Sequence, residues 1–377
     1  MTPDLAPTML ALVLFLELLG RVMYRLDRDS RSRREAAQDR RRGLSYLGEH
    51  APTLLRDLYR MEKRYLPLLG WLGAPNMRLP TISTNTLGFR DDAIEPRQRG
   101  EYRILVTGGS LAWGLGASCN GATVAAQIQA LLDQQAGTQR HRVMSGAFLN
   151  WTSRQEYVVV TEFFDRFDPD LVISLSGYND LMTLAKGVEI GNLPEARLLE
   201  QAVRDELQPM TTRRALRRLA GTLGIWRLVV LMRETLRARG PEPQQHHRYD
   251  DTGGPQRIER TIRRYLSIAD FLARRERRYL IALEPEIYSS EKPLTVEEFD
   301  LKTRFMHLEQ GIVPTLTRYR RELLAGLEQQ SGDRFRLVDL AGVFDTERAP
   351  VFIDYNHVCD RGNTLIARAL VKALPGA

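Results

Sequence analysis

Cysteine is scarce in this chain, and its spacing excludes one class of site. The 377 residues contain only Cys119 and Cys359, and no CxxC pair occurs. A structural zinc site built on cysteines needs closely spaced ligands, so we expect neither a metal nor another cofactor. We expect two reduced thiols and leave open whether Cys119 and Cys359 pair.

Phosphate-binding and nucleic-acid motifs are also missing. Neither GxxxxGK[ST] nor GxGxxG occurs. The chain is basic, with a formal net charge of +7, but no recognisable nucleic-acid motif or basic run interleaved with aromatics is present. We therefore expect no nucleic-acid partner. Nine arginines lie between residues 21 and 42, so part of the excess positive charge is local. Such a segment is typical of a solvated or membrane-surface stretch.

The longest hydrophobic run is short for a membrane span, and it lies at the N-terminus. The 17 residues from Thr8 to Tyr24 would form a helix of about 25 Å, against roughly 30 Å of hydrocarbon in a bilayer. Glu17 and Arg21 interrupt the run on one helix face. We favour a single membrane-spanning helix. A membrane-surface or partner-docking helix and a cleaved signal peptide are the alternatives. The basic flank favours a cytoplasmic location for the rest of the chain.

The remaining sequence predicts an α/β protein. Amphipathic spacing predicts a helix over residues 46–75, and residues 76–100 are typical of an extended lead-in. Short apolar runs predict five buried strands at 102–106, 142–144, 170–175, 279–283 and 335–340. Helical stretches separate them, at 122–132, 153–167, 256–278 and 299–329. Strands alternating with helices indicate a parallel five-stranded sheet in a three-layer α/β/α arrangement.

The sequence thus divides into three parts. Residues 1–45 are the N-terminal helix and basic segment, 46–100 the helical and extended lead-in, and 101–377 the α/β domain. Residues 186–255 interrupt the alternation of strands and helices and predict a helical insertion. We expect this insertion to act as a lid or as a docking surface for a protein partner.

Ser110 follows the first predicted strand of the domain in the sequence GGSLAWG. Ligands of open α/β sheets bind at the carboxyl ends of the strands, so a serine flanked by Gly108 and Gly109 would be accessible to a ligand there. The phosphate-loop alternative fails on spacing. Ser110 is therefore a candidate nucleophile.

Two further segments supply matching chemistry. Asp354 and His357 lie in DYNH, where an aspartate three residues before a histidine can orient the imidazole that takes a serine proton. Asn179 follows the third strand in GYND, where Gly177 permits the turn and the asparagine amide could donate to an oxyanion. The alternative is that Asn179 and Asp180 simply form a turn or a helix cap. We expect Gly109, Gly177 and Asp180 to support the site.

These blocks, in this order, resemble the SGNH/GDSL hydrolase family, in particular a bacterial membrane-associated subgroup. The resemblance covers about residues 80–377 and includes NTLGFRDD, TSRQE and LEPEIYSSEKPLT. It implies a flavodoxin-like fold, with Ser110 as nucleophile and Asp354 and His357 as its acid/base pair. It also implies that the Ser110 N–H and the Asn179 side chain bind the oxyanion, and that such anchored enzymes often face the periplasm.

One block departs from the family pattern. The family has a glycine before the TSxQE-like stretch, whose N–H completes the oxyanion hole, and Asn150 takes that position here. Any residue other than proline has a backbone N–H, and asparagine tolerates positive φ better than most. Asn150 is thus the third expected oxyanion residue.

The resemblance implies a serine esterase or acyl hydrolase acting on acyl esters of lipids or glycans. Two alternatives stay open. An O-acyltransferase would use the same triad to pass the acyl group to a sugar hydroxyl, and a membrane-complex accessory subunit would keep the fold for binding.

Overall fold

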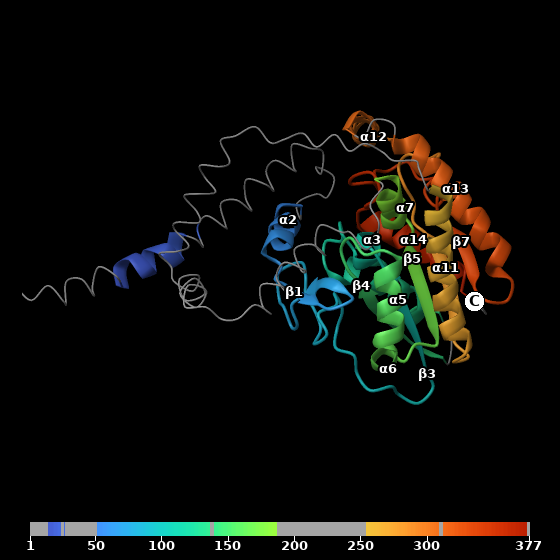
Figure 1. Ribbon diagram of the computed structural model, residues 1–377. Helices are drawn as coiled ribbons and strands as arrows, with labels where there is room; N and C mark the ends of the chain where they lie inside the picture. Colours follow the sequence, from blue (N-terminus) through green and yellow to red (C-terminus); the bar gives the residue numbers. More distant parts are fainter. Residues whose placement is uncertain are drawn as a thin grey trace, which may run out of the picture. The chain divides into compact units, whose positions relative to one another are not determined.

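The computed structural model describes residues 14–23, 26, 51–135, 139–186, 254–308 and 312–374 (Figure 1). The chain divides into two compact units, residues 39–190 with 248–377 and residues 1–38 with 191–247. The first unit contains every strand that is described and all residues of the candidate site. The predicted insertion at 186–255 and the basic segment at 21–42 lie almost entirely outside the described residues.

The centre of the first unit is a parallel five-stranded sheet with the strand order β4-β3-β5-β6-β7. The strands are β3 (Glu101–Gly108), β4 (Arg140–Ala147), β5 (Leu171–Ser176), β6 (Arg278–Leu283) and β7 (Arg336–Asp339). Each overlaps one of the five predicted runs, so the prediction of a parallel five-stranded sheet is confirmed. All six residues of β5 are buried, as expected for a central strand covered on both faces.

Helices pack on the sheet in two groups. Helix α4 (Val124–Asp133) packs against β4 and α14 (Asp360–Lys372). In a second group, α11 (Gly254–Ala273) packs against both α5 (Ser153–Glu162) and α13 (Ile312–Ser331). Figure 1 shows the second group in front of the sheet and α14 behind it. The buried side chains of α11 recur every three or four residues, which gives the helix one apolar face.

Strand register brings three loops to one edge of the sheet. Gly108, the last residue of β3, pairs with Ala147 of β4 and with Leu175 of β5. The three neighbouring strands therefore end together. The loops that follow them, around Ser110, Asn150 and Asn179, start from the same edge.

The predicted helix over 46–75 is wrong beyond residue 60. Helix α2 (Ala51–Arg60) is followed by an antiparallel hairpin of β1 (Lys63–Leu66) and β2 (Gly70–Gly73). Pro67 cannot donate a helical hydrogen bond, and Leu68 and Gly70 have φ of 68° and 84°. The left-handed turn at these residues reverses the chain, although the apolar spacing is helical.

Two other predicted helices are each divided. The stretch 153–167 breaks at Phe163, after which α6 (Phe164–Phe167) begins. The stretch 299–329 contains α12 (Val296–Leu308) and α13, with residues 309–311 outside the described part. In both cases one continuous apolar spacing covers two separate helices.

The N-terminal apolar run is helical over residues 14–23, where Arg21 Nε lies 2.8 Å from Glu17 Oε1. Leu14, Phe15 and Leu18 are exposed. No helix among the described residues has both the length and the apolar character to span a bilayer. The membrane-spanning helix expected over residues 8–24 is therefore not found in this part of the chain.

Candidate active site

Ser110 is the first residue of the short helix α3 (Ser110–Trp113), directly beyond β3. A Cβ on Gly108 would lie 2.0 Å from the Leu175 carbonyl oxygen, so only glycine permits the close approach of β3 and β5 at this point. The Ser110 side chain thus emerges where the strands end. It is 5% exposed.

His357 connects Ser110 to Asp354. The Ser110 Oγ lies 2.6 Å from His357 Nε2, and His357 Nδ1 lies 2.6 Å from Asp354 Oδ2. These distances fall in the range for a serine and its general base. The structure therefore brings together three residues that the sequence separates by up to 247 positions.

A small hairpin carries the acid and the base. Phe352 and Val358 form an antiparallel bridge, and the Ile353 N–H donates to the His357 carbonyl at 2.9 Å. The other oxygen of Asp354 accepts from the N–H groups of Asn356 and His357 at 3.0 and 2.8 Å. Asp354 therefore fixes the backbone of the loop with one oxygen and the imidazole with the other.

Burial alone would raise the pKa of Asp354. The His357 ring and the two backbone N–H donors outweigh burial and lower it. Asp354 is consequently ionised throughout the neutral range. An ionised carboxylate on Nδ1 holds the tautomer whose Nε2 can accept the Ser110 proton.

Two of the predicted oxyanion residues, Asn150 and Asn179, lie just beyond the ends of β4 and β5. The Asn179 Nδ2 donates to the Trp151 carbonyl at 2.8 Å, and a Cβ on Gly109 would lie only 2.4 Å from this Nδ2. Asn179 follows Gly177, whose φ of 116° makes the turn from β5 into α7 (Tyr178–Ala185). Asn150 has a φ of 59°, a conformation in which glycine is usual and asparagine is tolerated.

Asp180 has a structural role that joins two of the predicted blocks. Its carboxylate accepts from the Ser153 N–H at 2.8 Å and from the Ser153 hydroxyl at 2.6 Å. Thr152 and Gln155 form a capping box at the start of α5. The TSRQE stretch thus ties α5 to the loop that carries Asn179.

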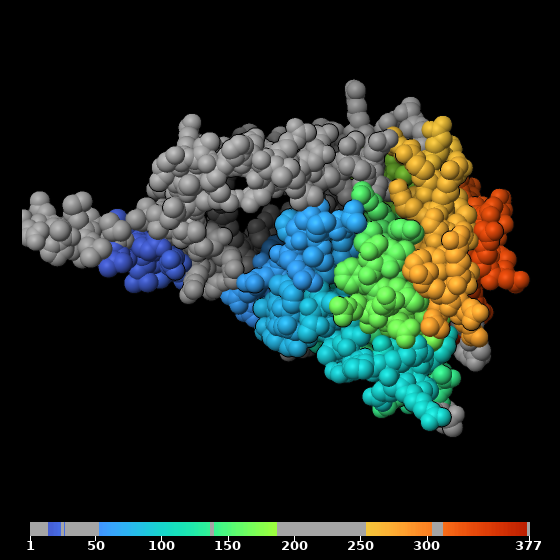
Figure 2. Space-filling model, turned by 60° about the horizontal axis from the view of Figure 1, so that its bottom comes forward, coloured from blue at the N-terminus to red at the C-terminus, as the bar shows by residue number. Residues whose placement is uncertain are grey.

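The N-terminal lead-in supports the site from outside. Trp151 Nε1 donates to the Trp71 carbonyl at 3.1 Å, so the β1–β2 hairpin contacts the loop beside Asn150. Figure 2 shows the lead-in, in blue, lying against the green surface around α5.

Arg90, also in the lead-in, is buried and donates to the Gly114 and Thr81 carbonyls at 2.7 and 2.8 Å. Burial lowers the pKa of Arg90 to about 10. The sequence predicts no role for Trp71 or Arg90; only Arg90 carries a signal, because it lies in the NTLGFRDD stretch that resembles the family.

Two buried acids lie on elements next to the site, Glu156 on α5 and Glu284 directly after β6. Burial, with a smaller contribution from the nearby Asp180 carboxylate, raises the pKa of Glu156 to about 7. Neither Glu156 oxygen meets hydrogen-bond geometry within the described residues, although the hydroxyls of Ser174 and Ser176 partly offset the effect of burial. Burial also raises the pKa of Glu284, which accepts from the Tyr178 N–H at 3.3 Å.

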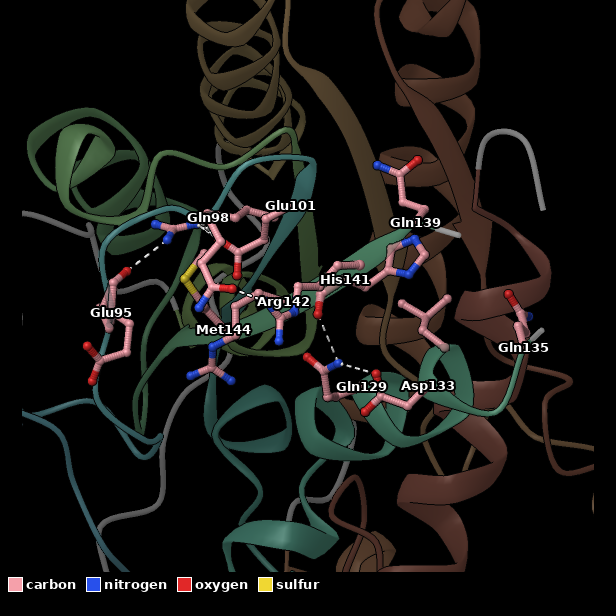
Figure 3. A pocket seen from close by; sticks show the side chains of 14 residues that line it. Glu95, Gln98, Glu101, Gln129, Asp133, Gln135, Gln139, His141, Arg142 and Met144 are labelled. Carbon is pink, nitrogen blue, oxygen red and sulfur yellow. Dashed lines mark hydrogen bonds and ion pairs between the residues drawn. The ribbon is translucent and has the colours of Figure 1, made fainter. Parts of the chain in front are cut away.

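Two cavities are found elsewhere in the described residues. The larger, of about 460 Å³, lies at the amino ends of β3 and β4, the opposite end of β3 from Ser110 (Figure 3). Gln129, on α4, donates there to Asp133 and to the His141 carbonyl. The smaller, of about 220 Å³, is lined by Arg90, Asp91 and Arg142 among others. Ser110 lines neither of these two cavities. Cys119 and Cys359 are both free thiols.

Comparison with known proteins gives a distant likeness of fold. No family model and no curated protein matches the sequence. The chain is similar to a catalytic mutant of an acetylxylan esterase from Geobacillus stearothermophilus, at 14% identity and a TM-score of 0.42, over 72% of this chain and 93% of that one. It is also similar to an acetyl xylan esterase, at 11% identity and a TM-score of 0.40, over 72% and 100%. A third similar structure is a protein from Desulfitobacterium hafniense described as lipolytic and of the G-D-S-L family, at 9% identity and a TM-score of 0.39, over 72% and 99%.

Proposed function

We propose that the protein is a serine ester hydrolase that cleaves acyl esters with Ser110 as nucleophile. The observation that supports this most is the continuous pair of 2.6 Å contacts from Ser110 Oγ through the His357 ring to Asp354. A serine hydroxyl is a weak nucleophile until a neighbouring base takes its proton. Here the base is in contact and is oriented by an ionised carboxylate.

The reaction would run through an acyl-enzyme. Ser110 Oγ attacks the ester carbonyl carbon while His357 Nε2 takes the hydroxyl proton. The negative charge formed on the carbonyl oxygen would be bound by the N–H groups of Ser110 and Asn150 and by the Asn179 amide. The alcohol leaves with the proton held by His357. Water then attacks the acyl-enzyme with His357 as base, which releases the carboxylic acid and restores Ser110.

The substrate class that we propose is an acyl ester of a lipid or a glycan. The three groups expected to bind the oxyanion would stabilise the tetrahedral state of any such ester, whatever its alcohol. Hydrolysis of short-chain p-nitrophenyl esters is therefore the first activity to measure. Adding a sugar alcohol as a second acceptor tests for acyl transfer, because a transferase would form the sugar ester in competition with the free acid.

Labelling with a fluorophosphonate probe tests the nucleophile. The wild-type protein should be labelled, and Ser110→Ala should not. The matched control is Ser118→Ala, because Ser118 lies in the same loop but its hydroxyl donates to Asp360. This control should label as wild type does. Absence of wild-type labelling, beside a control hydrolase that reacts, would refute the enzyme and favour a binding subunit.

A further inference from the structure

Glu298 is a buried carboxylate that binds the chain just ahead of the catalytic loop. Its Oε1 accepts from the N–H groups of Val351 and Phe352 at 2.8 and 3.0 Å. Its Oε2 accepts from the Thr295 N–H at 3.0 Å and from Lys292 Nζ at 2.7 Å. Two oxygens thus hold four donors, and three of these donors belong to the backbone.

The Lys292–Glu298 ion pair is fully buried. Both side chains are 0% exposed, and Lys292 Nζ also donates to the Pro293 carbonyl at 3.0 Å. A buried ion pair is a poor source of stability, because the cost of desolvating two charges can exceed their attraction. A well-packed apolar pair of the same size would serve stability as well. The polar contacts of Glu298 therefore call for another explanation.

Those contacts lie directly beside the acid and the base. Val351 and Phe352 form the first arm of the hairpin that carries Asp354 and His357, and the second arm pairs back through the Cys359 N–H to the Val351 carbonyl at 2.9 Å. Glu298 accepts hydrogen bonds from the N–H groups of Val351 and Phe352 in the first arm. Hydrogen bonds between the two arms thus close the hairpin, and Glu298 fixes its first arm to the start of α12.

We propose that Glu298 is a positioning residue that sets the place of Asp354, and through it of the His357 ring, with Lys292 as the counter-charge that orients the Glu298 carboxylate. The proposal rests on the hydrolase function above. Hydrogen bonds have defined directions and apolar packing does not, so a carboxylate with two neighbouring N–H donors fixes this arm in one register. A displacement of about 1 Å in a reacting group can lower kcat about 100-fold.

Glu298→Gln tests this role, because glutamine keeps the size of the side chain but has one acceptor oxygen in place of two. Some of the four donors must then lose their acceptor. We expect kcat for a p-nitrophenyl ester to fall about 10- to 100-fold, with KM within about threefold of wild type. The low-field proton NMR signal of the His357 Nδ1–H that faces Asp354 should shift or disappear.

Two further variants separate positioning from stability. Glu101→Gln is the matched control, because Glu101 forms a largely buried ion pair with Arg103 at 3.0 Å, at the opposite end of β3 from Ser110. This control should lose thermal stability but keep kcat and the NMR signal. Lys292→Met retains the three backbone donors of Glu298 and should lower kcat less than Glu298→Gln does. It decides the question if Glu298→Gln does not fold.

The outcomes are distinct. The proposal is overturned if folded Glu298→Gln or Lys292→Met keeps wild-type kcat and an unchanged His357 signal, or if Glu101→Gln loses kcat to the same extent. If the wild-type protein hydrolyses no ester, the proposed function fails, and the NMR signal then tests the positioning by itself. A signal that changes in the Glu298 variant and not in the control supports the role of Glu298.

Discussion

Gly109→Ala should disable the oxyanion side of the site without touching the triad. Gly109 has a φ of −85°, which any residue can adopt, so alanine brings no backbone strain there. Its Cβ, however, would lie 2.4 Å from Asn179 Nδ2 and 3.2 Å from the Trp151 carbonyl oxygen. A carbon cannot approach a nitrogen that closely. The Asn179 amide must therefore turn away from its present position.

The expected size follows from the group that is displaced. Removing one side-chain donor from an oxyanion hole costs about 100- to 1,000-fold in kcat, or about 2.7–4 kcal/mol of barrier. KM should change little, because the donor acts on charge that develops only in the transition state. Asn179→Ala should cause the same loss. The double variant should be no worse than either single variant, because both changes remove one interaction.

The assay is steady-state hydrolysis of a p-nitrophenyl ester, beside thermal unfolding of each variant. Gly121→Ala is the matched control, since the nearest atom to its Cβ would be the Cys119 sulfur at 3.8 Å, an ordinary contact. The reasoning is refuted if Gly109→Ala keeps kcat within threefold of wild type. It is refuted equally if the losses from Gly109→Ala and Asn179→Ala multiply in the double variant.

Three other changes have defined outcomes. Asp354→Asn should lower kcat about 10⁴-fold in the ester assay, because an amide on Nδ1 favours the wrong His357 tautomer. Burial raises the pKa of Glu156 to about 7, so between pH 4.5 and 7 this side chain ionises more readily in the unfolded protein than in the folded one. Its contribution to the free energy of unfolding is therefore complete below about pH 4.5 and is lost as the pH rises to 7. Relative to wild type, Glu156→Gln should gain about 3 kcal/mol in free energy of unfolding as the pH rises from 4.5 to 8, measured by urea denaturation. The gain is about 1.36 kcal/mol for each pH unit between the ordinary pKa of 4.5 and the folded pKa of about 7. Trp151→Phe loses the hydrogen bond to the Trp71 carbonyl and should lower the free energy of unfolding by about 1 kcal/mol in the same assay.

The sheet was predictable because each buried parallel strand is a short apolar run. Ile173 and Leu280, for example, are fully buried at the centre of such runs. The hairpin at 63–73 was not, because its apolar residues keep helical spacing while Pro67 and the left-handed Leu68 decide the backbone. Local spacing reports which residues are buried. It does not report where the chain reverses.

The site was predictable as far as its groups follow strands. Ser110 and Asn179 come just after β3 and β5, and the register of these strands carries their loops to one edge. The left-handed backbone of Asn150 agrees with its placement in a glycine position. The contact of His357 with Ser110 depends on a hairpin near the C-terminus, and the sequence pointed to that contact through the DYNH block alone.

The contacts that hold the site in place could not be found in this way, although Asp180 itself is one of the residues that the sequence predicts to support the site. Glu298 meets Val351 across 53 residues, and Asp180 meets Ser153 across 27. In sequence each is an ordinary acid at the start of a helix, a position where an acid is usual. Their function depends on burial, because a carboxylate removed from water must find donors, and the donors it finds here are backbone N–H groups next to the reacting residues. A search for reacting groups passes over such acids. They become recognisable only when each oxygen is matched with the segment that it binds.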